Sequence, residues 1–301
     1  MPITDEAPDP SSVEEVLRWI NRTHGTNWRL IERLAGGYQE GAYELADTNC
    51  ARGVLKWHRA HLREKQLRET ARLLDRARGR GWPTSRWLAF GPLAKEGAFI
   101  VEEFIEGTRP VRLDGILDSL LNALELQADA HPVTDQDWSS YIYRCVFEGE
   151  ADLARRMRAR SETAALQDRL ERLTARARGI QLPSADLVHG DFVLNNMIVR
   201  DGKPYLVDAA HAGKGTRVYD LATLLFETAV GGDYVTPDLA VQRRLEGRCL
   251  DIAGRDVFVV ALACRIMHLL VFGGVDWSND VPRTVARCVE FLDMLETTRT
   301  S

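Results

Sequence analysis

Lysine is scarce in this chain of 301 residues: arginine supplies nearly all of the 39 basic residues. The 44 acidic residues outnumber them, and the net charge is −5. A chain without a basic excess has no electrostatic footprint for DNA or RNA, so we expect no nucleic-acid partner. The small acidic excess would suit a small cationic partner.

Paired cysteines and long apolar runs are also missing. The five cysteines are odd in number and no C-x-x-C sequence occurs, which indicates neither a zinc knuckle nor a redox pair and predicts reduced thiols. The N-terminus has no signal-peptide pattern. The longest apolar region, residues 257–275, is interrupted by Arg265 and His268, which predicts a buried helix. We therefore expect a cytoplasmic protein without a membrane partner.

One loop carries polar residues at a fixed spacing. His189, Asp191 and Asn196 follow the order H-x-D-x-x-x-x-N, and Asp208 comes shortly afterwards. This is the spacing of a kinase catalytic loop and its metal-binding aspartate. Asp191 would accept or orient the proton of an attacking hydroxyl, and Asn196 and Asp208 would supply the hard oxygen ligands that Mg²⁺ prefers. The alternative is a polar turn between two strands.

The surrounding sequence favours the catalytic interpretation. Residues 196–200 and 203–208 flank Asp201-Gly202, a strong signal for a tight β-hairpin turn. A loop that leads into a hairpin with an aspartate at its far end is the kinase arrangement. His189 is expected to hydrogen-bond the loop rather than to act as a base.

The secondary-structure signals change character near residue 106. Strands are expected at residues 28–34, 43–47, 53–57, 87–90 and 98–104, with helices at 11–23 and 62–78. Helical periodicity then dominates residues 113–130, 151–178, 219–229 and 236–298. The pattern predicts an α+β bilobal fold, in which residues 1–105 form a five-stranded antiparallel sheet plus helix and residues 106–301 form a mostly helical lobe.

Phosphoryl transfer also needs a loop that closes over the phosphates and a positively charged side chain beside them. Gly36, Gly37 and Gly41 lie between two predicted strands, where glycine lets the backbone approach a ligand closely. A plain glycine-rich hairpin has the same composition. Lys56, in Gly-Val-Leu-Lys, would neutralise the α- and β-phosphates.

Two further parts are expected in the N-terminal lobe. Glu69 is the preferred ion-pair partner of Lys56, because apolar residues flank it, whereas Glu64 lies in a run of charges. Glu103 and Ile105 lie at the predicted hinge, where the carbonyl of the first and the amide of the second would pair with the adenine edge.

The stretch His189-Gly190-Asp191 with Asn196, Asp208 and Tyr219-Asp220-Leu-Ala resembles the aminoglycoside phosphotransferase family, the small-molecule branch of the kinase-like fold. Gly190 stands where protein kinases have arginine, and no Ala-Pro-Glu segment follows. The resemblance implies ATP, with GTP as the alternative, and Mg²⁺ as cofactors. It also implies four roles: Asp191 as the catalytic residue, Asn196 and Asp208 as metal ligands, Lys56 and Glu69 as the ion pair, and Asp220 as a brace of the loop.

The acceptor is the least determined part. The family phosphorylates aminoglycosides, viomycin- and capreomycin-type peptides, macrolides, choline, homoserine and amino sugars. This chain departs from many relatives at Ala210, where they carry an acid, and at Thr216-Arg217, where they have Asp-Pro. Glu227 and Asp233 are candidate contacts for a polycation, with ordinary surface charge as the alternative.

We therefore expect an ATP-dependent O-phosphotransferase that inactivates a small cationic antibiotic, acting as a monomer or homodimer. The alternatives are a metabolic kinase for choline, homoserine or a fructosamine, and a nucleotide-binding pseudokinase that serves as a scaffold.

Overall fold

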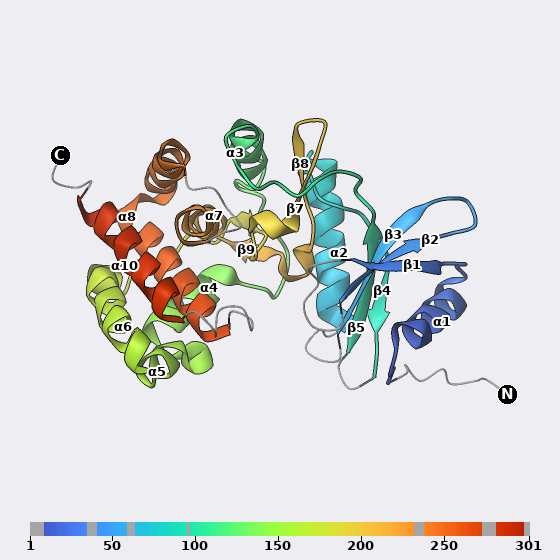
Figure 1. Cartoon of the computed structure of the whole chain (residues 1–301), viewed down its shortest axis with the longest axis horizontal. Helices are drawn as coiled ribbons and strands as arrows, with labels where there is room; N and C mark the ends of the chain where they lie inside the picture. The colour runs from blue at the N-terminus through green and yellow to red at the C-terminus, as the bar shows by residue number, and fades with distance from the viewer. Residues whose placement is uncertain are drawn as a thin grey trace.

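The computed structural model describes residues 9–34, 41–58, 64–94, 97–231, 238–272 and 281–297. It has an α+β architecture with a sheet-containing N-terminal lobe beside a helical C-terminal lobe (Figure 1). The elements of the first lobe are α1 Val13–His24, β1 Arg29–Leu34, β2 Ala42–Ala46, β3 Arg52–His58, α2 Glu64–Gly79, β4 Trp87–Pro92 and β5 Ala98–Glu103.

The five strands form one antiparallel sheet in the order β1-β2-β3-β5-β4. Helix α1 covers one face, where Val16 and Ile20 join the strand residues Leu45 and Leu55 in one apolar cluster. Leu67 of α2 belongs to a different cluster, with strand residues of β5. Figure 1 shows α2 between the sheet and the helical lobe. The predicted five-stranded sheet and its helix are confirmed.

The C-terminal lobe is built from helices around the largest core cluster. Its helices are α3 Leu117–Glu125, α4 Trp138–Phe147, α5 Leu153–Arg158, α6 Ser161–Thr174, α7 Val218–Val230, α8 Leu239–Phe272 and α10 Val281–Thr297. Residues 257–264 of α8 are all buried, so this part of the apolar run forms core. Among the described helices, none combines the length and apolarity that a bilayer crossing needs.

Two short antiparallel pairs deliver the candidate site. Strand β6, Asp186–Val188, pairs with β9, Gly213–Gly215. Strands β7, Met197–Arg200, and β8, Lys203–Leu206, form the predicted hairpin. Asp201 and Gly202 both have positive φ, 52° and 73°, which is the backbone of the tight turn that matches strand twist.

Two helical predictions are corrected. The expected helix over 151–178 is interrupted, because Arg160 is extended (φ −112°, ψ 127°) and separates α5 from α6. Helix α4 was not expected from the sequence. Asp137 caps it by accepting a hydrogen bond from the Ser140 amide at 2.9 Å, and this Asp-x-x-Ser signal was the available clue.

Candidate active site

The loop after β6 is held in place by one buried carboxylate. Asp220, in the first turn of α7, is fully buried. Its two oxygens accept hydrogen bonds from the amides of His189 at 2.7 Å and Gly190 at 3.0 Å. The Gln127 side chain donates a third at 2.8 Å. Burial raises the pKa of Asp220, and these donors oppose that effect. The carboxylate therefore fixes the backbone that leads to Asp191.

His189 ties the same loop to the end of the hairpin. Its imidazole is buried, with Nε2 3.1 Å from the Val207 carbonyl and Nδ1 3.3 Å from the Asp191 amide. A carbonyl only accepts and an amide only donates, so Nε2 carries the proton and Nδ1 accepts. Both ring nitrogens are thus engaged in holding the loop rather than in reaching a substrate.

Gly190 is required by the close approach of an aromatic ring. Its φ is +90°, and a Cβ built there would lie 2.2 Å from the Trp138 ring. Trp138 begins α4, stacks on Tyr219 with centroids 5.1 Å apart, and donates to the His211 carbonyl at 2.9 Å. The ring therefore occupies the space that a side chain at position 190 would need.

Asp191 lies at the exposed end of this loop, with its side chain 48% accessible. The Asn196 amide nitrogen donates to its carboxylate at 2.8 Å and to its carbonyl at 3.0 Å. Arg265 of α8 lies 3.7 Å from its other carboxylate oxygen. The carboxylate is thus oriented from two sides and still open to a ligand.

Asn196 and Asp208 are neighbours across the open end of the hairpin, because the Val207 amide donates to the Asn196 carbonyl at 2.9 Å. Asp208 adopts a left-handed backbone (φ 64°), which costs energy for a residue other than glycine and occurs preferentially at functional sites. The Asn196 amide nitrogen faces Asp191, so its oxygen is the atom left to bind a cation. An amide oxygen beside a carboxylate fits Mg²⁺.

Lys56 reaches this group from the other lobe. Its ammonium lies 3.3 Å from Asp208 and also forms an ion pair with Glu102 of β5. Glu102 is buried and accepts a hydrogen bond of 2.5 Å from the Ser85 hydroxyl. Burial alone would lower the pKa of Lys56, but the Asp208 and Glu102 carboxylates outweigh it and raise that pKa. Burial would likewise raise the pKa of Asp208, and Lys56 holds it below its ordinary value.

The prediction of an ion pair between Lys56 and Glu69 is wrong, because Lys56 pairs with Glu102 and Asp208. Glu69 instead lies 3.5 Å from Lys65, one turn earlier on α2, and accepts from the Asp135 amide at 3.2 Å. Leu67 and Thr70 are among the buried residues of α2, and Glu69, between them, contacts Lys65 and Asp135 rather than Lys56. On β5, Ile100 pairs with Lys56, and Glu102, two residues further, shares its face of the sheet.

Glu227 faces the catalytic loop from α7. Its carboxylate accepts a hydrogen bond of 2.6 Å from the Leu194 amide. Burial raises the pKa of Glu227 to about 7, against the lowering effect of that amide and of Arg265, and Asp191 raises it further. The side chain therefore braces the loop in this structure, which the sequence did not indicate.

The remaining predicted residues are only partly described. Gly36, Gly37 and Asp233 lie outside the described residues. Gly41 has φ +96° and immediately precedes β2. Glu103 ends β5, and Ile105 follows it in a buried position; their pairing with adenine stays a prediction.

Sequence reasoning missed Glu102, Arg265 and Trp138. The alternation of β5 opposite Lys56 was a usable signal for Glu102, because residues two apart share a face. Arg265 was visible only as a charge inside an apolar run. Nothing in the sequence connects Trp138 to Gly190, since the contact is made by tertiary packing.

Comparison with known proteins identifies relatives of this chain. The model of the phosphotransferase enzyme family, APH, matches residues 30–255. None of the curated proteins matches the chain in sequence.

Solved structures share the fold at low sequence identity. A thermostable mutant of the aminoglycoside phosphotransferase APH(4)-Ia, in ternary complex with ADP and hygromycin B, is 16% identical, with a TM-score of 0.66 over 92% of this chain and 97% of that one. The amicoumacin kinase hAmiN, in complex with AMP-PNP, Ca²⁺ and Ami, is 15% identical, with a TM-score of 0.61 over 91% and 95%. An aminoglycoside-3'-phosphotransferase of type VIII is 23% identical, with a TM-score of 0.56 over 86% and 99%.

Proposed function

The chain belongs to the phosphotransferase enzyme family, and we propose that it transfers the γ-phosphate of ATP to a hydroxyl group of a small cationic antibiotic. The acceptor class would be an aminoglycoside or a viomycin- or capreomycin-type peptide, and the transfer would give resistance. The observation that carries this proposal is the convergence of Lys56, Asp191, Asn196 and Asp208 from two lobes on one place.

Asp191 would orient the acceptor hydroxyl and take its proton. Asn196 and Arg265 orient the two oxygens of its carboxylate. The carboxylate would then hold the acceptor hydroxyl in position for in-line attack on the γ-phosphorus. In phosphoryl transfer such positioning and electrostatic stabilisation contribute most of the catalysis. Asp220 and His189 would act indirectly, by holding the backbone of Asp191.

Asn196 and Asp208 would hold Mg²⁺, and Lys56 would contact the α- and β-phosphates. When bound, the metal neutralises charge that develops on the phosphate oxygens. Structural relatives hold ADP or AMP-PNP, and one holds Ca²⁺, which supports a nucleotide and a divalent ion here. ATP is the proposed donor, with GTP as the alternative, and the protein is proposed to act in the cytoplasm.

An antibiotic acceptor is supported by two relatives in fold, one with hygromycin B and the other an amicoumacin kinase. Glu227 lies beside the catalytic loop, and Asp233 follows α7 in sequence. An acidic group beside the loop would attract an ammonium group of a polycation. Their role as acceptor contacts is part of the proposal, as is action as a monomer or homodimer.

The test is a panel of aminoglycosides and cationic peptide antibiotics incubated with the protein, ATP and MgCl₂. Mass spectrometry should detect a product heavier by ~80 Da, one phosphoryl group. Asp191→Asn should lower kcat about 10²- to 10⁴-fold, the usual contribution of a positioned general base. Asp201→Asn, at the hairpin turn, is the control, because asparagine also fits that turn.

Three outcomes would change the proposal. Unchanged turnover in Asp191→Asn would rule out the proposed role of Asp191 as the residue that orients the hydroxyl and takes its proton. Transfer to choline, homoserine or a fructosamine, with none to any antibiotic, would assign a metabolic kinase. Nucleotide binding without transfer to any acceptor would assign a pseudokinase scaffold.

A further inference from the structure

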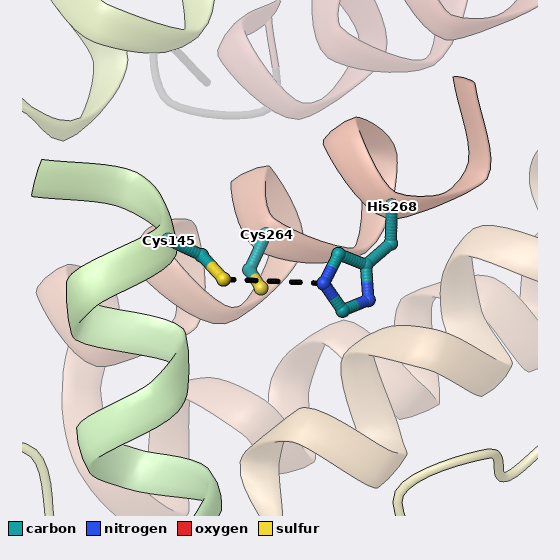
Figure 2. A group of neighbouring side chains, drawn as sticks. All are labelled: Cys145, Cys264 and His268. Carbon is teal, nitrogen blue, oxygen red and sulfur yellow. Dashed lines mark hydrogen bonds between the residues drawn. The ribbon is translucent and has the colours of Figure 1, made fainter. Parts of the chain in front are cut away.

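Behind the candidate active site, two helices bring two thiols and an imidazole together (Figure 2). Cys145 comes from α4, and Cys264 and His268 come from α8. One ligand atom from each of the three side chains lies within 4.8 Å of the other two. Both thiols are buried and the imidazole is partly buried. None of these residues has a role in the proposed phosphoryl transfer.

The arrangement follows from helix geometry. Cys264 and His268 are four residues apart, so they lie on one face of α8, one turn above the other. Cys145 faces them from the neighbouring helix, and Figure 2 shows the three side chains directed toward a common point. A pair of ligands at i and i+4 with a third from a facing element is a recurrent way to build a metal site on helices.

The distances are close to those of a tetrahedral zinc site. With Zn–S near 2.3 Å and Zn–N near 2.0 Å, a sulfur and a nitrogen bound to one zinc lie about 3.6 Å apart. Here the Cys145 sulfur and the His268 Nε2 atom are 4.0 Å apart. Small side-chain rotations close that difference. The Tyr141 hydroxyl oxygen is 2.9 Å from the same nitrogen, so it or a water can take the fourth position.

The charges also suit a divalent ion. Thiolates are the form in which cysteines bind a metal, so binding releases a proton from each thiol. Two thiolates, a neutral imidazole and a dication sum to zero charge, which removes the penalty of burying an unpaired ion.

We propose that Cys145, Cys264 and His268 bind a thiophilic transition-metal ion, Zn²⁺ in the first instance, and thereby join α4 to α8. Binding forms two metal–sulfur bonds and one metal–nitrogen bond, and the thiol protons pass to water. No oxidant or reductant takes part. Soft thiolates with an imidazole select zinc over the hard cations that oxygen ligands hold.

The site lies next to the elements that support the catalytic loop. Arg265, adjacent to Cys264, contacts Asp191. The Tyr141 ring meets Trp138, the ring that adjoins Gly190, edge-on with centroids 5.7 Å apart. A metal that fixes α4 against α8 would therefore stabilise the support of the loop. The proposal itself stands on the three ligands and is independent of any acceptor.

Cobalt is the spectroscopic probe for the experiment. Full-length protein, reduced and freed of metal, is titrated with Co²⁺ and then with Zn²⁺. We expect one Co²⁺ per chain, a thiolate-to-cobalt charge-transfer band, the visible bands of tetrahedral cobalt, and loss of all of them when Zn²⁺ displaces it. Cys264→Ser and His268→Gln should each weaken binding at least about 10-fold, the scale of losing a metal contact. Cys249→Ser, also buried on α8 but outside the cluster, should bind as the unmodified protein does.

X-ray absorption of the zinc-loaded, unmodified protein supplies a measurement that needs no variant. Two sulfur scatterers near 2.3 Å and nitrogen or oxygen scatterers near 2.0 Å are expected. A cobalt complex without a charge-transfer band would overturn the proposal. Equal metal affinity in Cys264→Ser, Cys249→Ser and the unmodified protein would also overturn it, as would a zinc shell containing only oxygen and nitrogen.

Discussion

The Lys56 ammonium lies between two carboxylates, Glu102 from its own lobe and Asp208 from the other. Glu102 thus takes the place that was expected for Glu69. Because Glu102 is buried and hydrogen-bonded to Ser85, it fixes where the lysine points. We infer that it positions Lys56 toward the phosphates of a bound nucleotide.

Glu102→Gln should weaken the use of ATP much more than Glu69→Gln does. Glutamine keeps the shape and the Ser85 contact but loses the charge, and a charge-assisted contact contributes about 1.5–3 kcal/mol. We expect kcat/KM for ATP to fall about 10- to 100-fold in Glu102→Gln. Steady-state kinetics of both variants with one acceptor test this, and an equal loss in Glu69→Gln would contradict it.

Glu227 predicts a pH dependence of stability. Its pKa is raised from 4.5 to about 7, mainly by burial, so the folded chain holds this proton more tightly than the unfolded chain. The contribution of this proton to the free energy of unfolding is therefore complete below pH 4.5, and it is lost as the pH rises through 7.

Glu227→Gln should remove this dependence, because its side chain stays uncharged. Relative to the unmodified protein, the variant should gain stability as the pH rises from 4.5 to above 7, by up to about 3 kcal/mol at ~1.4 kcal/mol per pKa unit. Urea unfolding at both ends of this range measures the difference, with Glu64→Gln on α2 as a control for the loss of one charge. If the difference in stability between Glu227→Gln and the unmodified protein does not change with pH, the pKa of Glu227 is not raised in the folded chain.

At the scale of elements, α8 contains a break that one of its glycines, Gly254, explains. Gly254 has φ 74° and ψ 177°, a backbone that is close to glycine-only. The break separates residues 239–253 from the buried run that carries Cys264 and Arg265. It therefore sets the direction of the segment that reaches Asp191.

Substitution of two glycines of α8 by alanine should act in opposite directions. Gly254→Ala should destabilise the protein by about 1–3 kcal/mol, because alanine cannot adopt that backbone without strain. Gly247, on the same helix, has open space at its Cβ position, and Gly247→Ala should stabilise by about 0.5–1 kcal/mol through helix propensity. Thermal unfolding of both variants measures these effects. A loss of stability in both would show that the backbone conformation of Gly254 does not explain the effect of its substitution.

At the scale of the whole molecule, local patterns predicted local structure well and contacts between distant segments poorly. The turn at Asp201-Gly202 was predictable because glycine adopts positive φ readily and aspartate tolerates it, and the hairpin then brought Asp208 beside Asn196. The partner of Lys56 was mispredicted because the rotation of α2 on the sheet is set by packing. The cluster of Cys145, Cys264 and His268 was invisible because two helices far apart in sequence meet there.

The two lobes are joined around the candidate site itself. The Leu206 carbonyl accepts from the Thr84 hydroxyl at 2.9 Å, its amide donates to the Pro83 carbonyl at 2.6 Å, and Lys56 contacts Asp208 across the same junction. A nucleotide with Mg²⁺ held by residues of both lobes would add to these contacts in the folded state alone.

Mg²⁺ and ADP together should therefore raise Tm, and neither alone should do so to the same extent. At 100 times Kd a ligand that binds only the folded chain stabilises it by about 2.7 kcal/mol, or several degrees for a chain of this size. Asp208→Asn should abolish the contribution of Mg²⁺, because it removes the charged ligand while leaving Lys56 in place. Differential scanning fluorimetry with ADP, with and without Mg²⁺, measures both effects. An Mg²⁺-dependent shift that survives in Asp208→Asn would place the metal on other residues.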